Sequence, residues 1–122
     1  MTRRALILAS HGSRHEPAAN ALLREWAMEI RRRGEFAHVV AAFHLGEPRF
    51  CEVLDAMEFD EVVVVPVMTS QGYYCDEFLP AELKKNLHYA EMRLTITPPV
   101  GIHPDGQALV ARRLDELARR FD

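Results

Sequence analysis

Histidines with polar neighbours lie where apolar, strand-like runs end. His11 sits in residues 10–14, Ser-His-Gly-Ser-Arg, directly after one such run, and His44 ends a second. His103 follows a fourth run and precedes a proline, so a role in structuring its loop is an alternative to a role in a site. Neutral imidazole binds Co, Ni, Fe(II) and Zn, and it accepts protons near neutral pH. These residue types therefore predict a site that binds a divalent metal or takes up protons.

A carboxylate and two aromatic residues are expected near the histidines. Glu47 follows the second strand, and Tyr73 and Tyr74 lie in the segment after the third. His11, His44 and Glu47 could together hold a divalent metal. The alternatives are a hydrogen-bonded loop histidine, a glutamate that caps a helix beginning at the next residue, and tyrosines that only pack or that face a flat ligand.

Four apolar runs alternate with four helical patterns and must position these side chains. The strands are predicted over residues 5–10, 39–44, 61–68 and 93–97. Because the runs are mostly continuous, they indicate strands buried on both faces, as in a parallel sheet. The βαβαβαβα order predicts a three-layer αβα domain with a four-stranded, mainly parallel sheet. Ligands gather outside the carboxyl ends of such strands.

The helical patterns assign inward faces and boundaries. The first helix is expected to begin near Pro17, the second at Pro48, the third near Asp76 and the fourth at Asp105 as N-cap. Pro66 is expected to mark the end of regular pairing in the third strand. The inward residues are predicted to be Ala19, Leu22, Leu23, Trp26, Ala27 and Ile30 in the first helix, Phe50, Leu54 and Met57 in the second, Leu79, Leu83 and Leu87 in the third, and Val110, Leu114, Leu117 and Phe121 in the fourth.

Length and composition narrow the class of protein. The 122 residues suit one domain, and 48% hydrophobic residues suffice for a core. A net charge of −3 argues against a nucleic-acid or anionic-membrane partner. Cys51 and Cys75 are far apart, which fits a reduced, cytoplasmic protein. No phosphate-loop, dinucleotide or serine-nucleophile motif is present, which excludes the enzyme classes that depend on them. No organic cofactor is expected.

Taken together, the motifs resemble the short class II chelatases, the CbiX/SirB-type sirohydrochlorin chelatases. Residues 10–14 are similar to that family's [GS]-H-G-S-R opening, residues 43–48 to its F-L-E-x-A-E-P segment, and residues 99–104 to its P-L-G-x-H-P segment. The resemblance runs in order through nearly the whole chain, so residues 1–122 are expected to form a single CbiX-like chelatase domain.

The resemblance implies insertion of a divalent metal, cobalt, nickel or iron, into sirohydrochlorin by a homodimer. Two histidines of the family bind metal and assist proton removal. The first corresponds to His11, whereas the position of the second is occupied by Tyr74, and the usual glutamate of the second-strand motif is replaced by His44.

This exchange supports two interpretations. His44 could replace the missing imidazole, so that His11 and His44 are catalytic and bind metal with Glu47. Alternatively, the chain is a non-catalytic module that binds a tetrapyrrole or a metal.

Substrate contacts are predicted for Ser10, Arg14, Tyr73, Tyr74 and His103. Candidate partners for the macrocycle's carboxylates are Arg14, Arg49, Lys84 and Lys85. Phosphoryl transfer is disfavoured, because histidine phosphatases place an arginine where this chain has Ser10.

Overall fold

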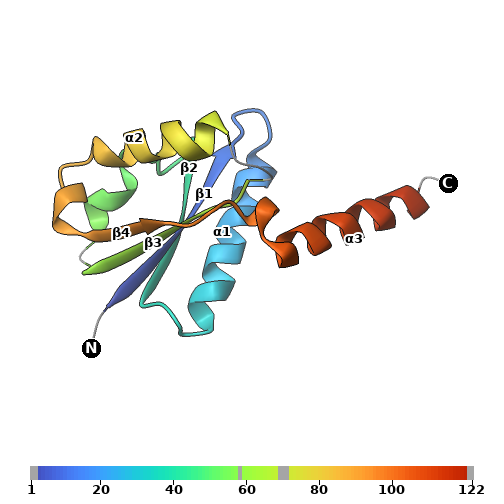
Figure 1. The fold of residues 1–122 in the computed structure, drawn as a ribbon, viewed down its shortest axis with the longest axis horizontal. Coiled ribbons are helices and arrows are strands. Elements are labelled where there is room, and N and C mark those ends of the chain that lie inside the picture. The colour runs from blue at the N-terminus through green and yellow to red at the C-terminus, as the bar shows by residue number, and fades with distance from the viewer. Residues whose placement is uncertain (1–2, 58, 69–71, 121–122) are drawn as a thin grey trace.

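One parallel sheet of four strands forms the centre of the molecule (Figure 1). The structure, a computed structural model, describes residues 3–57, 59–68 and 72–120. The strands are β1 (Arg4–Gly12), β2 (His38–Leu45), β3 (Glu61–Pro66) and β4 (Arg93–Ile96), arranged in the order β2-β1-β3-β4. All three pairings are parallel, and β3 ends at its proline, as predicted.

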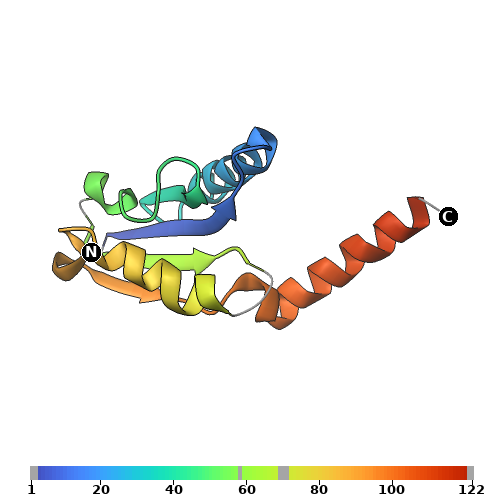
Figure 2. The same ribbon diagram turned by 90° about the horizontal axis from the view of Figure 1, so that it is seen from above.

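Alternate residues of β1 enter separate hydrophobic clusters on the two faces of the sheet. Ile7 packs in a cluster with Leu79 and Leu83 of α2 (Leu79–Lys84), whereas Leu8 packs with side chains from α1 (Pro17–Arg32). Figure 2 shows the layers from above. The predicted three-layer αβα arrangement is therefore confirmed.

The first helix buries only part of its predicted inward face. Leu23 and Ala27 are buried and Ile30 is partly buried. Ala19, Leu22 and Trp26 are exposed, so their predicted inward positions are wrong.

The prediction of a second helix that begins at Pro48 is wrong. No helix begins at Pro48; a 3₁₀ turn, η1 (Val53–Ala56), occurs later. The Pro48 carbonyl accepts a hydrogen bond from the Phe43 N–H, which ties this segment to β2 rather than to a helix. The three residues predicted to point inward are nevertheless buried: Phe50, Leu54 and Met57.

The third helix begins and ends earlier than predicted. A π-helical turn, η2 (Tyr74–Phe78), leads directly into α2. Because α2 ends at Lys84, Leu87 lies outside the helix and is 91% exposed, so its predicted inward position is wrong. Two 3₁₀ turns, η3 (Tyr89–Glu91) and η4 (Val100–Ile102), flank β4.

The fourth helix, α3 (Pro104–Arg120), projects away from the body in both views (Figures 1 and 2). It begins one residue before Asp105, which therefore lies in the first turn rather than at the N-cap. Phe121 lies outside the described residues, as do the side chains of Val110, Leu114 and Leu117. Within the described part of the chain, no helix is long and apolar enough to cross a bilayer.

Candidate functional site

The register of β1 and β2 places two histidines side by side. Ser10 pairs with Phe43 and Gly12 with Leu45, so His11 and the intervening His44 lie at the same level of adjacent strands. Both follow the alternation that points toward α2. Their ring centroids are 5.2 Å apart and the rings meet edge to face. The strand ends therefore bring two imidazoles into direct contact.

The π-helical turn η2 adds aromatic rings to this pair. The Tyr74 ring lies 4.6 Å from His11 and 5.7 Å from His44, and Phe78 lies 4.5 Å from His44, measured between centroids. Tyr73 packs against Tyr74 and is 62% exposed. We call these five residues the histidine–aromatic cluster. Phe78 was missed in the sequence, although its spacing of four from Tyr74 on one helical face was a usable signal.

His11 makes a contact that bears on its tautomer. Its Nδ1 lies 3.2 Å from the Gly12 carbonyl oxygen, which can only accept. The contact is a hydrogen bond when Nδ1 carries the proton, and in the neutral ring Nε2 then presents a lone pair. Such a nitrogen can bind a metal or accept a proton.

His44 is biased toward its neutral form. Burial lowers its pKa below the ordinary value, and the neighbouring His11 and Arg14 lower that pKa further, while Glu82 opposes the shift. A neutral imidazole is the form that binds metals and accepts protons.

Gly12 allows the two strand ends to approach each other. Its φ of +74° is a conformation that side-chain-bearing residues rarely adopt. A Cβ at this position would lie 2.6 Å from the Leu45 carbonyl oxygen. Only glycine therefore permits this close approach beside His11.

Asn20 of α1 connects the same two strand ends. Its Oδ1 accepts the Ser13 N–H at 3.0 Å, and its Nδ2 donates to the Ser13 and Leu45 carbonyls at 3.2 and 3.0 Å. The amide is buried, so these bonds are shielded from water. Sequence reasoning missed this residue; the signal was a polar side chain on the inward face that also carries Leu23 and Ala27.

A cleft of about 330 Å³ adjoins the histidine–aromatic cluster. His44 and Phe78 line it together with charged side chains. Arg49 pairs with Glu52 at 3.3 Å, and Lys85 pairs with Glu82 at 2.7 Å. The hydrogen bond to Glu82 raises the pKa of Lys85, which stays cationic. An acidic ligand in this cleft would meet cations that are already partly neutralised.

Comparison with known proteins identifies the chain's relatives. The family model described as CbiX matches residues 5–117. The chain belongs to the CbiX family. A probable sirohydrochlorin cobaltochelatase of Halobacterium salinarum is 40% identical over 80 residues, which cover 66% of this chain and 27% of the relative. The chain thus spans about a quarter of that relative's length.

Solved structures of similar fold include two from bacteria. A multi-domain protein of Deinococcus radiodurans with structural similarity to chelatases has a TM-score of 0.70 and 27% identity, over 85% of this chain and 26% of that one. A protein of Marinobacter aquaeolei, described as a CbiX protein of cobalamin (vitamin B12) biosynthesis, has a TM-score of 0.72 and 19% identity, over 96% and 98% of the two chains. The second match supports the fold alone.

Ser10, Arg14 and Glu47 of this CbiX-family chain follow or end the strands that carry the two histidines. Ser10 is partly buried at the end of β1, and Arg14 is exposed. Glu47 is exposed, and its backbone carbonyl accepts a hydrogen bond from Arg24. Its alternative role as a helix cap is wrong, because no helix begins at Pro48. Among the described residues no three His, Cys, Asp or Glu side chains group closely enough to hold a metal, so Glu47 as third ligand stays a prediction.

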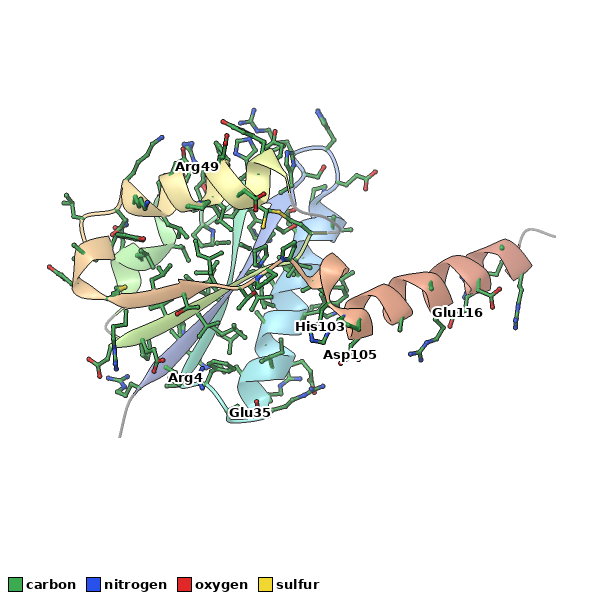
Figure 3. All side chains as sticks on the ribbon, in the orientation of Figure 1. Arg4, Glu35, Arg49, His103, Asp105 and Glu116 are labelled. Carbon is green, nitrogen blue, oxygen red and sulfur yellow. The ribbon has the colours of Figure 1, made fainter. Side chains whose placement is uncertain are left out.

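His103 lies at the start of α3, away from Arg49 in Figure 3. Its Nδ1 accepts a hydrogen bond from the Asp105 N–H at 3.1 Å. This bond fits the loop-structuring alternative, and contact with a substrate stays a prediction.

Proposed function

We propose that this CbiX-family chain inserts a divalent metal, Co²⁺ foremost, into sirohydrochlorin and is therefore a chelatase, a lyase. The observation that carries the proposal is the direct contact of His11 and His44 at the carboxyl ends of β1 and β2. The name of the Halobacterium relative supports both the macrocycle and the metal. Ni²⁺ and Fe²⁺ are further candidate substrates.

Metal insertion replaces two pyrrole N–H protons of the macrocycle by one divalent cation, so two protons must leave. In our proposal the Nε2 of His11 binds the incoming metal and replaces part of its water shell. His44, whose pKa is lowered by burial and by its neighbours, would accept a pyrrole proton and pass it to solvent. General-base catalysis of this kind increases the reaction rate roughly 10²–10⁴-fold. Binding the metal and the macrocycle together in the right orientation increases the rate further.

The aromatic rings of the cluster suit a flat substrate. Tyr73 and Tyr74 are both exposed, beside the two histidines, and could contact the face of a macrocycle. Arg14, Arg49, Lys84 and Lys85 are the candidate partners for its peripheral carboxylates. Arg49 and Lys85 would have to exchange their present carboxylate partners for the substrate's.

The proposal is tested by following sirohydrochlorin absorbance with Co²⁺, Ni²⁺ or Fe²⁺, against a control without protein. We expect acceleration that collapses in His11→Ala. His15→Ala is the matched control, because His15 is exposed and lies four residues further along. An unchanged rate in His11→Ala would overturn the proposal.

The resemblance places Tyr74 at the position of the family's second histidine, and this favours one alternative, a non-catalytic module that binds a tetrapyrrole or a metal. That module would shift the macrocycle's spectrum on mixing without accelerating metal insertion. We also propose that the chain acts in the cytoplasm as a homodimer, without an organic cofactor, a nucleic-acid partner or a membrane partner. Free thiols at Cys51 and Cys75 are consistent with a reducing compartment.

A further inference from the structure

A carboxylate lies in the wall of the cleft beside the histidine–aromatic cluster. Glu82 of α2 lines this cleft together with His44, Phe78 and Lys85. The Glu82 side chain is 18% exposed, whereas that of Lys85 is 65% exposed. The proposed substrate carries carboxylates, and a carboxylate in the wall would repel them. The position of Glu82 therefore needs an explanation that metal insertion alone does not supply.

Glu82 holds a cation of the cleft. The Nζ of Lys85 donates a hydrogen bond to Glu82 Oε1 at 2.7 Å, and this bond raises the pKa of Lys85, so the ammonium stays charged. A second cation, Arg49, pairs at 3.3 Å with Glu52, whose side chain is 53% exposed. Among the described residues that line the cleft, Glu82 is the one acidic side chain. The partner of Lys85 thus lies inside the cleft, where an incoming anion would also bind.

A carboxylate fixed beside Lys85 competes differently with free and with held anions. Glu82 and Lys85 are three residues apart at the end of α2, so the carboxylate stays beside the ammonium at a high effective concentration. A dissolved anion has no such advantage. A macrocycle on the histidine–aromatic cluster would have it, because His44 and Phe78 belong to both the cluster and the cleft.

We propose that Glu82 is a built-in competitor for Lys85, which yields to a carboxylate of a macrocycle held on the histidine–aromatic cluster but not to a free anion. Lys85 is then paired before and after binding, because the exchange breaks one ion pair and forms another. An exposed ion pair contributes little, so a held macrocycle can replace it. The inference rests on the proposed function for its ligand, a tetrapyrrole with carboxylate substituents, but it requires binding alone and no metal insertion.

The test is a titration of the full chain with metal-free sirohydrochlorin, followed by the absorbance of the macrocycle. Glu82→Gln keeps the size of the side chain and removes its charge, which frees Lys85. We expect this variant to bind about 2- to 5-fold more tightly than the wild type, the range that an exposed ion pair allows. Lys85→Gln should bind more weakly. Circular dichroism checks that each variant folds.

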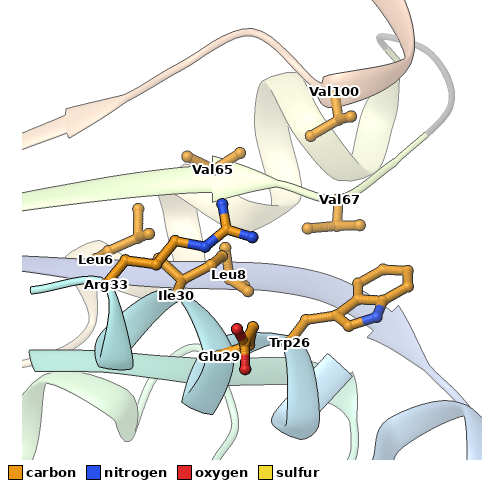
Figure 4. Close-up of a pocket in the computed structure, with 9 residues that line it drawn as sticks. All are labelled: Leu6, Leu8, Trp26, Glu29, Ile30, Arg33, Val65, Val67 and Val100. Atoms are coloured by element: carbon orange, nitrogen blue, oxygen red, sulfur yellow. The ribbon is translucent and has the colours of Figure 1, made fainter. Parts of the chain in front are cut away.

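Glu29→Gln is the matched control. Glu29 pairs with Arg32 at 3.0 Å with the same spacing of three residues, on α1. It lines a separate, largely apolar pocket, where Figure 4 shows it with Trp26 and Ile30. This variant should bind sirohydrochlorin as the wild type does, and a gain equal to that of Glu82→Gln would overturn the proposal, because it would show a general effect of removing negative charge.

A double variant separates competition from direct repulsion. In the Lys85→Gln background, Glu82→Gln should give no gain in affinity, because no ammonium remains to be freed. A gain that persists there shows that Glu82 only repels the substrate, and it overturns the proposal. Propionate, compared with chloride at equal ionic strength, should weaken sirohydrochlorin binding to Glu82→Gln and not to the wild type. Equal inhibition of both would exclude selection against free anions.

The titration also separates this inference from the proposed function. A wild type that does not bind sirohydrochlorin overturns both. A wild type that binds it, with a Glu82→Gln variant of equal or weaker affinity, overturns only the role of Glu82 as a competitor.

Discussion

Asn20 should control the geometry of the site, because its hydrogen bonds join the ends of the two strands that carry His11 and His44. Asn20→Ala removes the three hydrogen bonds that join the Ser13 segment to the Leu45 carbonyl. A hydrogen bond of this kind contributes about 0.5–1.5 kcal/mol, so the loss should reach about 1.5–4.5 kcal/mol of unfolding free energy. Urea unfolding followed by circular dichroism measures this loss.

The same substitution should slow metal insertion in molecules that remain folded. Because Asn20 holds the ends of β1 and β2 together, its loss lets His11 shift relative to His44. A displacement of about 1 Å can cost on the order of 10²-fold in rate. The assay measures the rate of Co²⁺ insertion into sirohydrochlorin in buffer without urea. Circular dichroism under the same conditions checks that the variant is folded.

Asn86→Ala is the matched control for this prediction. Asn86 is equally buried and also makes three hydrogen bonds, to the Cys51 carbonyl, to the Asp55 carboxylate and from the His88 N–H. It should lose similar stability but retain most of the rate. If the two variants lose rate to the same extent, Asn20 acts through stability alone and the reasoning is refuted.

Two further predictions concern stability. Gly12→Ala should lower the unfolding free energy by about 2–4 kcal/mol, because the new side chain meets both a positive φ and the Leu45 carbonyl. Gly34→Ala, where φ is +81° and the space is open, should lower it by about 1–2 kcal/mol. Equal losses in urea unfolding would contradict the role of the contact. Burial and the nearby Arg31 lower the pKa of His38, so as pH falls through about 6.5 the unfolded chain takes up the proton first and stability decreases. Unfolding free energies at about pH 7.5 and 5.5 should differ less in His38→Gln than in the wild type; an unchanged difference would exclude this histidine as a source.

The sheet was predictable because its strands are continuous apolar runs, a pattern with few alternative interpretations. The ends of β1 and β2 then followed from parallel pairing, which explains why His11 and His44 could be expected at one edge. The helix expected at Pro48 failed for a tertiary reason: the Pro48 carbonyl bonds to Phe43 of β2, a contact that local propensity does not contain.

The supporting residues of the site were harder to foresee. Asn20 and Phe78 act through contacts with segments far along the chain. Their positions on a helix face are a local signal, but that signal does not show which distant segment each side chain contacts. The outward direction of α3 was also beyond prediction, because an amphipathic pattern shows that a helix needs a partner without showing which surface supplies it.

The central claim of the proposed function is that His44 performs the role of the second histidine, which the resemblance places at the position of Tyr74. The most direct measurement is the rate of Co²⁺ insertion into sirohydrochlorin by His44→Gln and by the double variant His44→Gln/Tyr74→His. The Tyr74 ring lies 4.6 Å from His11, so an imidazole there would also be beside it. We predict a loss on the order of 10²-fold or more in the single variant and partial recovery in the double variant. A His44→Gln variant as fast as the wild type would contradict the account.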